Sequence, residues 1–287
     1  MKRITIFLLI TVLAQPYVIA GGGWPQPKKK GYFKLGQSAI ISDQFYDLEG
    51  EIIDLTTISL FTTSIYAEYG ITDRLTGVLY MPFFVRSTLN EVERRQSGIV
   101  EPGDAVNSFG DTDIGLKYAL ITGKKIALAA SVTLGLPFGK TAEGFSDAGE
   151  PRILQTGDGE FNQLLMVEAS RSFYPSPFYA SVGAGFNNRT NDFSDEFRYS
   201  FELGYTGLKK WNLALKVNGV ESLRNGDPGG GAGNGIFGNN VEFLAISPEV
   251  SYNATEKIGV AASAGFAASG SNILAAPNYS VGVFLKL

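Results

Sequence analysis

The chain has 287 residues, a formal net charge of -4, and neither cysteine nor histidine. Disulfide bonds, ordinary zinc sites and hydrolysis through a serine–histidine or aspartate–histidine pair are thereby excluded. Aromatic residues make up 12% of the chain and 35 residues are glycine, which favours a sheet protein with many turns. A carboxylate pair remains open as a route to catalysis, but we expect no enzyme, no metal and no cofactor.

The first twenty residues have the layout of a secretory signal peptide. Lys2 and Arg3 precede an apolar run over 4–13, and residues 18–20 fit a cleavage site. The run is too short to cross a bilayer as a helix, which takes about 20 residues. We therefore expect export, with 21–30 as a flexible, solvated periplasmic leader in front of a single domain over 31–287.

From Tyr32 to the end, apolar residues recur at every second position, the period of a β-strand with one buried face. Most of these segments are longer than a usual globular strand and match the roughly 9–11 residues of a tilted strand that crosses a bilayer. The predicted strands are 31–41, 55–70, 75–88, 111–122, 125–138, 160–174, 178–189, 196–207, 210–222, 241–254, 257–269 and 276–287.

Alternation alone would also fit a soluble β-sandwich. Two observations favour a membrane barrel. Short connections alternate along the chain with a second set of connections, several of which are long. Aromatic residues gather at both ends of the apolar faces. The opposite faces carry charged or very small residues. We predict an all-β, single transmembrane antiparallel β-barrel of 12 strands in a bacterial outer membrane, with short periplasmic turns, long extracellular loops and both termini periplasmic. The long connections are 42–54, 89–110, 139–159 and 223–240.

Three prolines fall inside predicted strands, where each removes a backbone donor. We expect bulges at Pro82, Pro137 and Pro248.

The alternation also predicts which charged side chains point into the lumen. Their mixed signs suit either ion pairs that fill the barrel or groups that line a pore and set its selectivity. The predicted lumen residues are Glu68, Arg86, Asp111, Asp113, Lys117, Glu168, Arg198, Glu202, Lys216 and Glu249.

Three segments resemble one family of outer-membrane barrels. They are "EYGITDRLTGVLYMPF" (68–83), "FGDTDIGLKYAL" (109–120) and "SVTLGLPFGK" (131–140). The family is named for the meta-pathway of phenol degradation and is related in role to hydrophobic-compound transporters. Gly110, Asp111, Lys117 and Tyr118 match its G-D-x-x-x-x-x-K-Y pattern. The resemblance implies uptake of small aromatic compounds.

The chain ends in mid-strand with "SVGVFLKL". Because unpaired backbone groups cannot face lipid, this strand must pair with the first strand as well as with its neighbour. The stretch also resembles the C-terminal signal that the barrel-assembly machinery recognises, although it ends in leucine where an aromatic residue is usual. The matching positions are Ser280, Gly282, Leu285 and Leu287.

Two functions fit this fold. The leading hypothesis is a channel or facilitator for passive passage of small solutes, with hydrophobic or aromatic compounds among the candidates. The alternative is a non-conducting barrel whose extracellular loops bind a surface partner. The expected partners are outer-membrane lipid, the barrel-assembly machinery and a small-molecule solute, but no nucleic acid. The solute, the openness of the lumen, the oligomeric state and the role of 223–240 stay undetermined.

Overall fold

A computed structural model of the chain describes residues 21–93, 100–123, 125–141, 154–227 and 237–287, so the predicted signal peptide lies outside the described residues. No helix in these ranges is long and apolar enough to cross a membrane. The strands in these ranges are β1 (Gly31–Tyr46), β2 (Ile52–Gly70), β3 (Leu75–Glu93), β4 (Val100–Ser108), β5 (Thr112–Ile121), β6 (Ala127–Leu136), β7 (Asn162–Ser172), β8 (Phe178–Arg189), β9 (Glu196–Leu208), β10 (Trp211–Ser222), β11 (Glu242–Asn253), β12 (Ile258–Ser271), β13 (Ile273–Leu274) and β14 (Asn278–Lys286).

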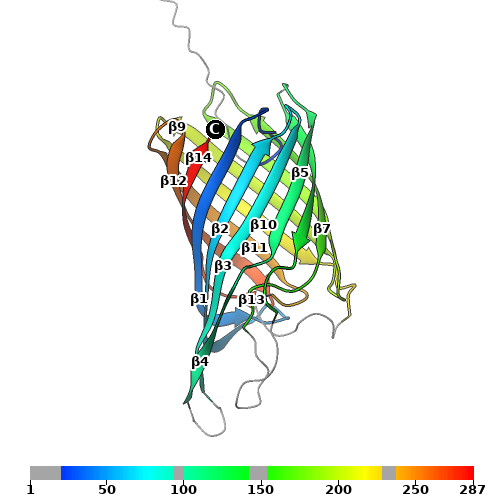
Figure 1. Ribbon diagram of the computed structural model, residues 1–287, viewed down its shortest axis with the longest axis vertical. Coiled ribbons are helices and arrows are strands. Elements are labelled where there is room, and N and C mark those ends of the chain that lie inside the picture. The colour runs from blue at the N-terminus through cyan, green and yellow to red at the C-terminus, as the bar shows by residue number, and fades with distance from the viewer. Residues whose placement is uncertain (1–20, 94–99, 124, 142–153, 228–236) are drawn as a thin grey trace, which may run out of the picture.

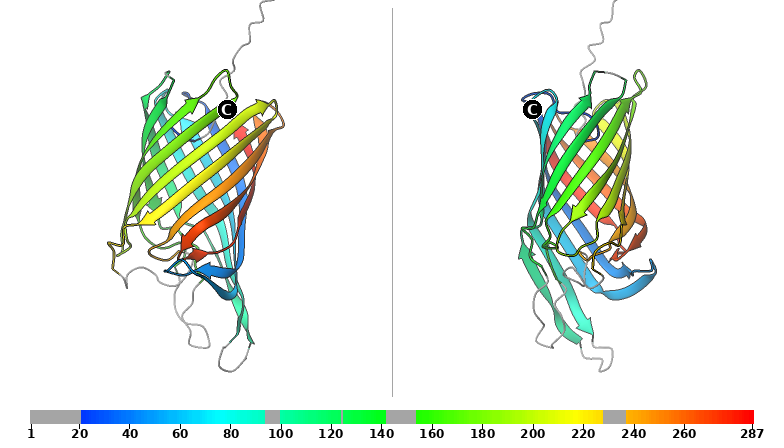
Figure 2. Two further views of the ribbon diagram at one scale, coloured as in Figure 1. Left: turned by 180° about the vertical axis from the view of Figure 1, so that it is seen from behind. Right: turned by 90° about the vertical axis from the view of Figure 1, so that its right-hand side faces the viewer.

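Twelve of these strands close into one antiparallel barrel, which confirms the predicted fold (Figures 1 and 2). They are β1 to β3, β5 to β12 and β14. The last strand closes the ring, because β14 pairs with β12 on one side and with β1 on the other. Closure leaves no unpaired edge in the barrel wall, which is what a sheet surrounded by lipid requires.

The two ends of the barrel differ. One end carries the short connections, the C-terminus and residues 21–30, since the Leu287 N–H donates to the Gly31 carbonyl over 2.9 Å. We call it the short-turn end. At the opposite, long-loop end, β3 and β4 form a hairpin that extends beyond the barrel wall (Figure 1).

Two connections that we predicted as long loops contain strand. β1 and β2 extend through most of 42–54, and β4 lies within 89–110. Continued pairing beyond the wall satisfies backbone groups that would otherwise need other partners.

The three prolines behave differently from one another. Pro82 lies at a bulge, because the β2–β3 register shifts where Thr63 pairs with Phe84 but Ile65 pairs with Met81. Pro137 directly follows β6 and so lies outside a strand. Pro248 pairs with Leu215 without a register shift, so the bulge predicted there is wrong.

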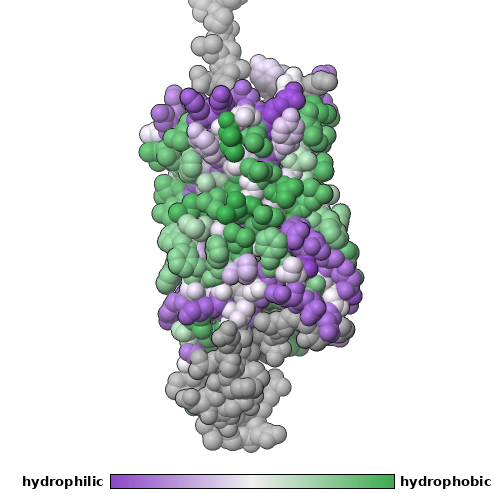
Figure 3. Space-filling model, turned by 45° about the vertical axis from the view of Figure 1, so that its right-hand side comes forward, coloured by the Kyte–Doolittle hydropathy of each residue, from purple (hydrophilic) through white to green (hydrophobic). Residues whose placement is uncertain are grey.

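The outside of the barrel is apolar. Along β6, Val132 and Leu134 are 49% and 39% exposed, whereas the intervening residues face inward and Ala129 on the inner face is fully buried. Figure 3 shows an apolar band around the waist, bounded on this face by hydrophilic residues toward both ends. Exposed aromatic residues lie near both ends of the strands, as in the belts of membrane barrels. Examples are Phe178, Trp211, Phe186, Phe197 and Tyr279.

Candidate functional site

Nine of the ten predicted lumen charges have the inward phase of their strands, but Arg86 lies on the outer face. Its register partner Phe61 shares a face with outward residues of β2, because Phe84 pairs with Thr63 on that face and is 46% exposed. The bulge at Pro82 inserts an extra residue, and a one-residue shift turns every later side chain of β3 to the other face. The Arg86 guanidinium donates to Asn107 of β4 over 3.0 Å instead.

Near the short-turn end, Lys117 of β5 lies between two carboxylates. Its Nζ is 3.3 Å from Glu68 Oε1 of β2 and 3.9 Å from Glu168 Oε2 of β7. The Tyr66 hydroxyl donates to the same oxygen, Glu68 Oε1, over 2.6 Å. The side chains of Lys117 and Glu68 are only 5% and 0% exposed. We call Glu68, Lys117 and Glu168 the Lys117 cluster.

Residues 21–27 fold into the barrel over this cluster. The Gln26 side-chain amide donates to Glu68 Oε2 over 2.8 Å, and the Gly22 carbonyl accepts from Lys117 Nζ over 3.0 Å. The Gly23 N–H donates to Ser170 of β7 over 2.8 Å. A Cβ at Gly23 would lie 2.7 Å from the Glu168 carbonyl oxygen, so the close approach requires glycine.

The solvated leader that we predicted over 21–30 is therefore wrong for its first part. Gln26 is 1% exposed, and the Trp24 ring lies edge-on to Tyr179 of β8 with centroids 5.8 Å apart. In this stretch only Pro27 and the lysines at 28–30 are exposed. Inward serine, threonine and carboxylate groups supply the hydrogen bonds that allow a polar backbone to be buried here.

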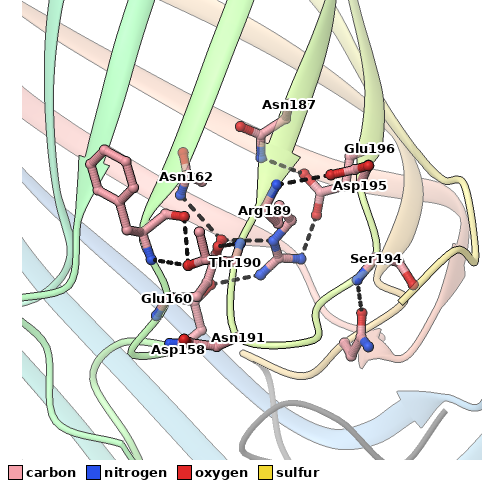
Figure 4. A network of polar contacts seen from close by, with 12 residues as sticks. Asp158, Glu160, Asn162, Asn187, Arg189, Thr190, Asn191, Ser194, Asp195 and Glu196 are labelled. Atoms are coloured by element: carbon pink, nitrogen blue, oxygen red, sulfur yellow. Dashed lines mark hydrogen bonds and ion pairs between the residues drawn. The ribbon is translucent and has the colours of Figure 1, made fainter. Parts of the chain in front are cut away.

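At the long-loop end, Arg189 of β8 is surrounded by three carboxylates (Figure 4). Its nitrogens lie 2.8 Å from Asp158, 2.7 Å from Glu160 and 2.7 Å from Glu196. The Phe193 ring covers the guanidinium at 4.3 Å. These contacts fix 158–160, which precede β7, to the start of β9. We call Arg189, Asp158, Glu160 and Glu196 the Arg189 network.

Asp111 ties the same connection to β5. Its carboxylate accepts from the backbone N–H groups of Gly139 and Asp158, each over 2.8 Å. Burial and the nearby Asp111 carboxylate raise the pKa of Asp158 to about 6, although Arg189 opposes the shift. Asp113 and Arg198 complete the predicted set: Asp113 pairs in register with Tyr80, and Arg198 donates to Glu196 over 2.6 Å.

A cavity of about 500 Å³ remains in the lumen, bordered by residues of β1 to β3, β8 to β12 and β14. Three predicted residues line it, namely Glu202, Lys216 and Glu249. Lys216 Nζ lies 3.0 Å from Glu249 Oε2, and the two side chains are 33% and 21% exposed. The wall also carries Tyr32, Lys34, Tyr66, Tyr80, Tyr179, Phe284 and Lys286.

Several residues of these sites were missed by the sequence analysis. Lys34, Arg189 and Lys286 each alternate in phase with inward neighbours, so period two alone could have found them. Gln26 carried no such signal, because it precedes the first strand and reaches the lumen only through the fold. In the described residues, no group of three or more potential ligands is placed to hold a metal ion.

Comparisons with known proteins support the fold. No family model and no curated protein matches the chain in sequence. Among solved structures, an outer-membrane channel from Pseudomonas putida F1 is similar over 94% of this chain and 100% of its own, with a TM-score of 0.68 and 14% identity. The translocator domain of the autotransporter NalP from Neisseria meningitidis is similar over 90% and 88%, with a TM-score of 0.51 and 10% identity.

At these identities the likeness shows the fold alone, an outer-membrane type of β-barrel. The barrel that the family resemblance implied is thus confirmed, whereas membership in the phenol-degradation family stays a prediction.

Proposed function

We propose that this chain is an outer-membrane channel through which small solutes pass passively. Its closed wall and apolar outer band suit a bilayer, and its lumen keeps a cavity of about 500 Å³. In barrels of this kind the short turns face the periplasm and the longer loops face outward. On that basis both ends of the described chain are periplasmic, and residues 21–27 narrow the periplasmic mouth.

The observation that carries this proposal is the contrast inside the lumen. Lys117 and Glu68 are nearly fully buried, whereas Lys216 and Glu249 border the cavity and remain partly exposed. Exposed charges on the wall of a narrow pore set which solutes enter and how firmly they are held. The pathway therefore runs along β1 and β10 to β14, beside the inserted residues 21–27.

Reconstitution into planar lipid bilayers tests the proposal. Purified protein should give discrete conductance steps, and vesicles that contain it should release or take up small solutes. Heat-denatured protein serves as the control. The absence of both conductance steps and solute flux would overturn the channel function.

The alternative, a non-conducting barrel that binds a surface partner, has one observation in its favour. The β3–β4 hairpin extends past the wall, where a partner would reach it (Figure 2). Under this alternative, removal of the hairpin tip or of loop 223–240 would abolish binding of the surface partner, while substitution of Lys216 would leave that binding unchanged.

We also propose that β14 carries the signal for the barrel-assembly machinery. Ser280 and Gly282 have the inward phase, while Leu285 and Leu287 are 38% and 43% exposed on the outside. Replacement of Leu287 by phenylalanine, the usual type of last residue, should increase the yield of folded barrel in the membrane. An unchanged yield would speak against the assignment.

A further inference from the structure

The seam where the barrel closes presents aromatic and cationic side chains to the cavity. Tyr32 of β1 pairs in register with Lys286 of β14, and Lys34 pairs with Phe284. All four line the cavity. The Tyr32 and Phe284 rings stack with centroids 5.5 Å apart, and Lys286 Nζ lies 5.1 Å from the Phe284 centroid.

Positive charge is in excess on this wall. Lys216 Nζ and Lys34 Nζ lie 3.0 Å and 3.9 Å from the same carboxylate oxygen, Glu249 Oε2. Lys286 Nζ donates to the neutral amide oxygen of Asn253 over 2.9 Å. Glu202, the other carboxylate of the wall, accepts from the Tyr179 hydroxyl over 2.6 Å. Three ammonium groups therefore face two carboxylates around the cavity described here, a surplus of one positive charge.

The accessibility of these groups suits a solute. Lys34, Lys216 and Glu249 are 21%, 33% and 21% exposed, in contrast to the nearly fully buried Lys117 and Glu68. A bound carboxylate would gain charge-assisted hydrogen bonds from ammonium groups that now share one acceptor. A flat ring would gain contact with the aromatic wall beside them. A neutral apolar solute would instead have to displace water from the lysines without replacing its hydrogen bonds.

We propose that this wall is a binding subsite for a small organic anion that carries a flat ring, such as an aromatic carboxylate. Lys216 and Lys34 hold the anionic group, and Tyr32 contacts the ring, supported by the stacked Phe284, which is itself 3% exposed. The cavity has room for one such molecule at a time. This inference rests on the proposed channel function, since it names the solute class that the pathway selects.

Ligand-observed NMR on the full chain in lipid nanodiscs tests the subsite with three probes. Benzoate has ring and charge, benzyl alcohol has the ring alone, and acetate has the charge alone. Benzoate should bind about tenfold more tightly than either of the other two, because each of them lacks one of the two sets of contacts. Equal affinity for benzoate and benzyl alcohol would overturn the anionic part of the proposal.

Two substitutions locate the binding. Lys216→Gln should weaken benzoate about tenfold and leave benzyl alcohol unchanged, and Tyr32→Leu should weaken both aromatic probes. Lys257→Gln, which changes an exposed lysine in a short turn, is the matched control and should change neither. Heat-dependent gel mobility shows that each variant is folded. Unchanged benzoate affinity in both folded cavity variants would overturn the subsite.

Bilayer recordings separate this inference from the channel function. Conductance steps without benzoate binding would overturn the subsite and leave the channel standing. Benzoate binding that Lys216→Gln weakens, in a protein without conductance, would overturn the channel and leave the subsite standing.

Discussion

Two ion pairs face the same lumen from opposite sides and differ in what covers them. Lys117 and Glu68 are 5% and 0% exposed beneath the inserted residues 21–27, whereas Lys216 and Glu249 are 33% and 21% exposed beside the cavity. Both pairs combine a lysine with a glutamate on inward positions: Lys216 and Glu249 lie on neighbouring strands, and β3 separates the strands of Lys117 and Glu68. Residue type and strand phase therefore place a charge in the lumen, whereas the segments that fold inside the barrel determine whether a solute can reach that charge.

The covered side is built from β2, β3, β5 and β7, whose inward Glu68, Thr76, Lys117 and Ser170 bind residues 21–27. The open side is centred on β1, β10, β11 and β14, and β2, β3, β8, β9 and β12 also contribute residues to the cavity wall. The inserted residues thus leave part of the lumen of the twelve-stranded barrel open.

Removal of the inserted residues 22–27 should produce the largest change in conductance. Deletion of 22–27 takes away the contacts to Glu68, Lys117 and Ser170, and it should widen the lumen at the short-turn end. We expect a severalfold larger single-channel conductance in planar bilayers. The control variant carries Lys28→Gln and Lys29→Gln, which alter exposed charges directly after the deleted residues, and it should have the conductance of the parent protein. A deletion variant with parental conductance would show that the segment does not narrow the pathway.

Loss of the arginine at the long-loop end should cause the next largest effect. Arg189→Gln leaves Glu160 and Glu196 buried without their cation, which typically costs about 3–5 kcal/mol. Denaturant-induced unfolding in lipid vesicles measures this loss. Arg224→Gln is the matched control, because Arg224 is 61% exposed and its pair with Glu242 should contribute less than about 1 kcal/mol. Similar losses in both variants would contradict the buried role of Arg189.

The stabilities contributed by Lys117 and Lys216 can be compared directly. Lys117→Met should lower the free energy of unfolding by about 3 kcal/mol, because it leaves Glu68 unpaired in a covered site. Lys216→Met should lower it by less than about 1 kcal/mol, because water reaches that pair. The same unfolding experiment serves for both. A larger loss of unfolding free energy in Lys216→Met than in Lys117→Met would contradict the distinction between a covered and an open side.

The smallest expected effect is a pH dependence at the long-loop end. The pKa of Asp158 is raised to about 6. Between the ordinary pKa of an aspartate and this raised pKa, the folded state therefore binds more protons than the unfolded chain. Stability should therefore increase as the pH falls from 7.5 toward 5. Asp158→Asn removes this contribution and should flatten the dependence. Asp195→Asn should not, because hydrogen bonds to this half-buried carboxylate lower its pKa and keep it ionised in this range. Identical slopes in parent and Asp158→Asn would contradict the assignment.

Much of the fold was predictable because the period of a strand is local. The alternation identified the barrel strands, their lipid and lumen faces and the closing role of β14, and the structure confirms each of these. The prediction failed at Arg86, where a bulge shifts the phase, and at 42–54 and 89–110, where strands extend beyond the wall. Both failures arise where local alternation no longer reports which face a residue occupies.

The sequence by itself determined the closed barrel and, except for Arg86 beyond the bulge at Pro82, the inward direction of the predicted charges, since side-chain direction follows from neighbouring positions along one strand. Only the tertiary structure decided which of those charges are covered. Gly23 reaches Ser170 across 147 positions of the chain, and Gln26 reaches Glu68 across 42. No local pattern records such contacts, because they depend on how the closed wall positions distant strands around one lumen.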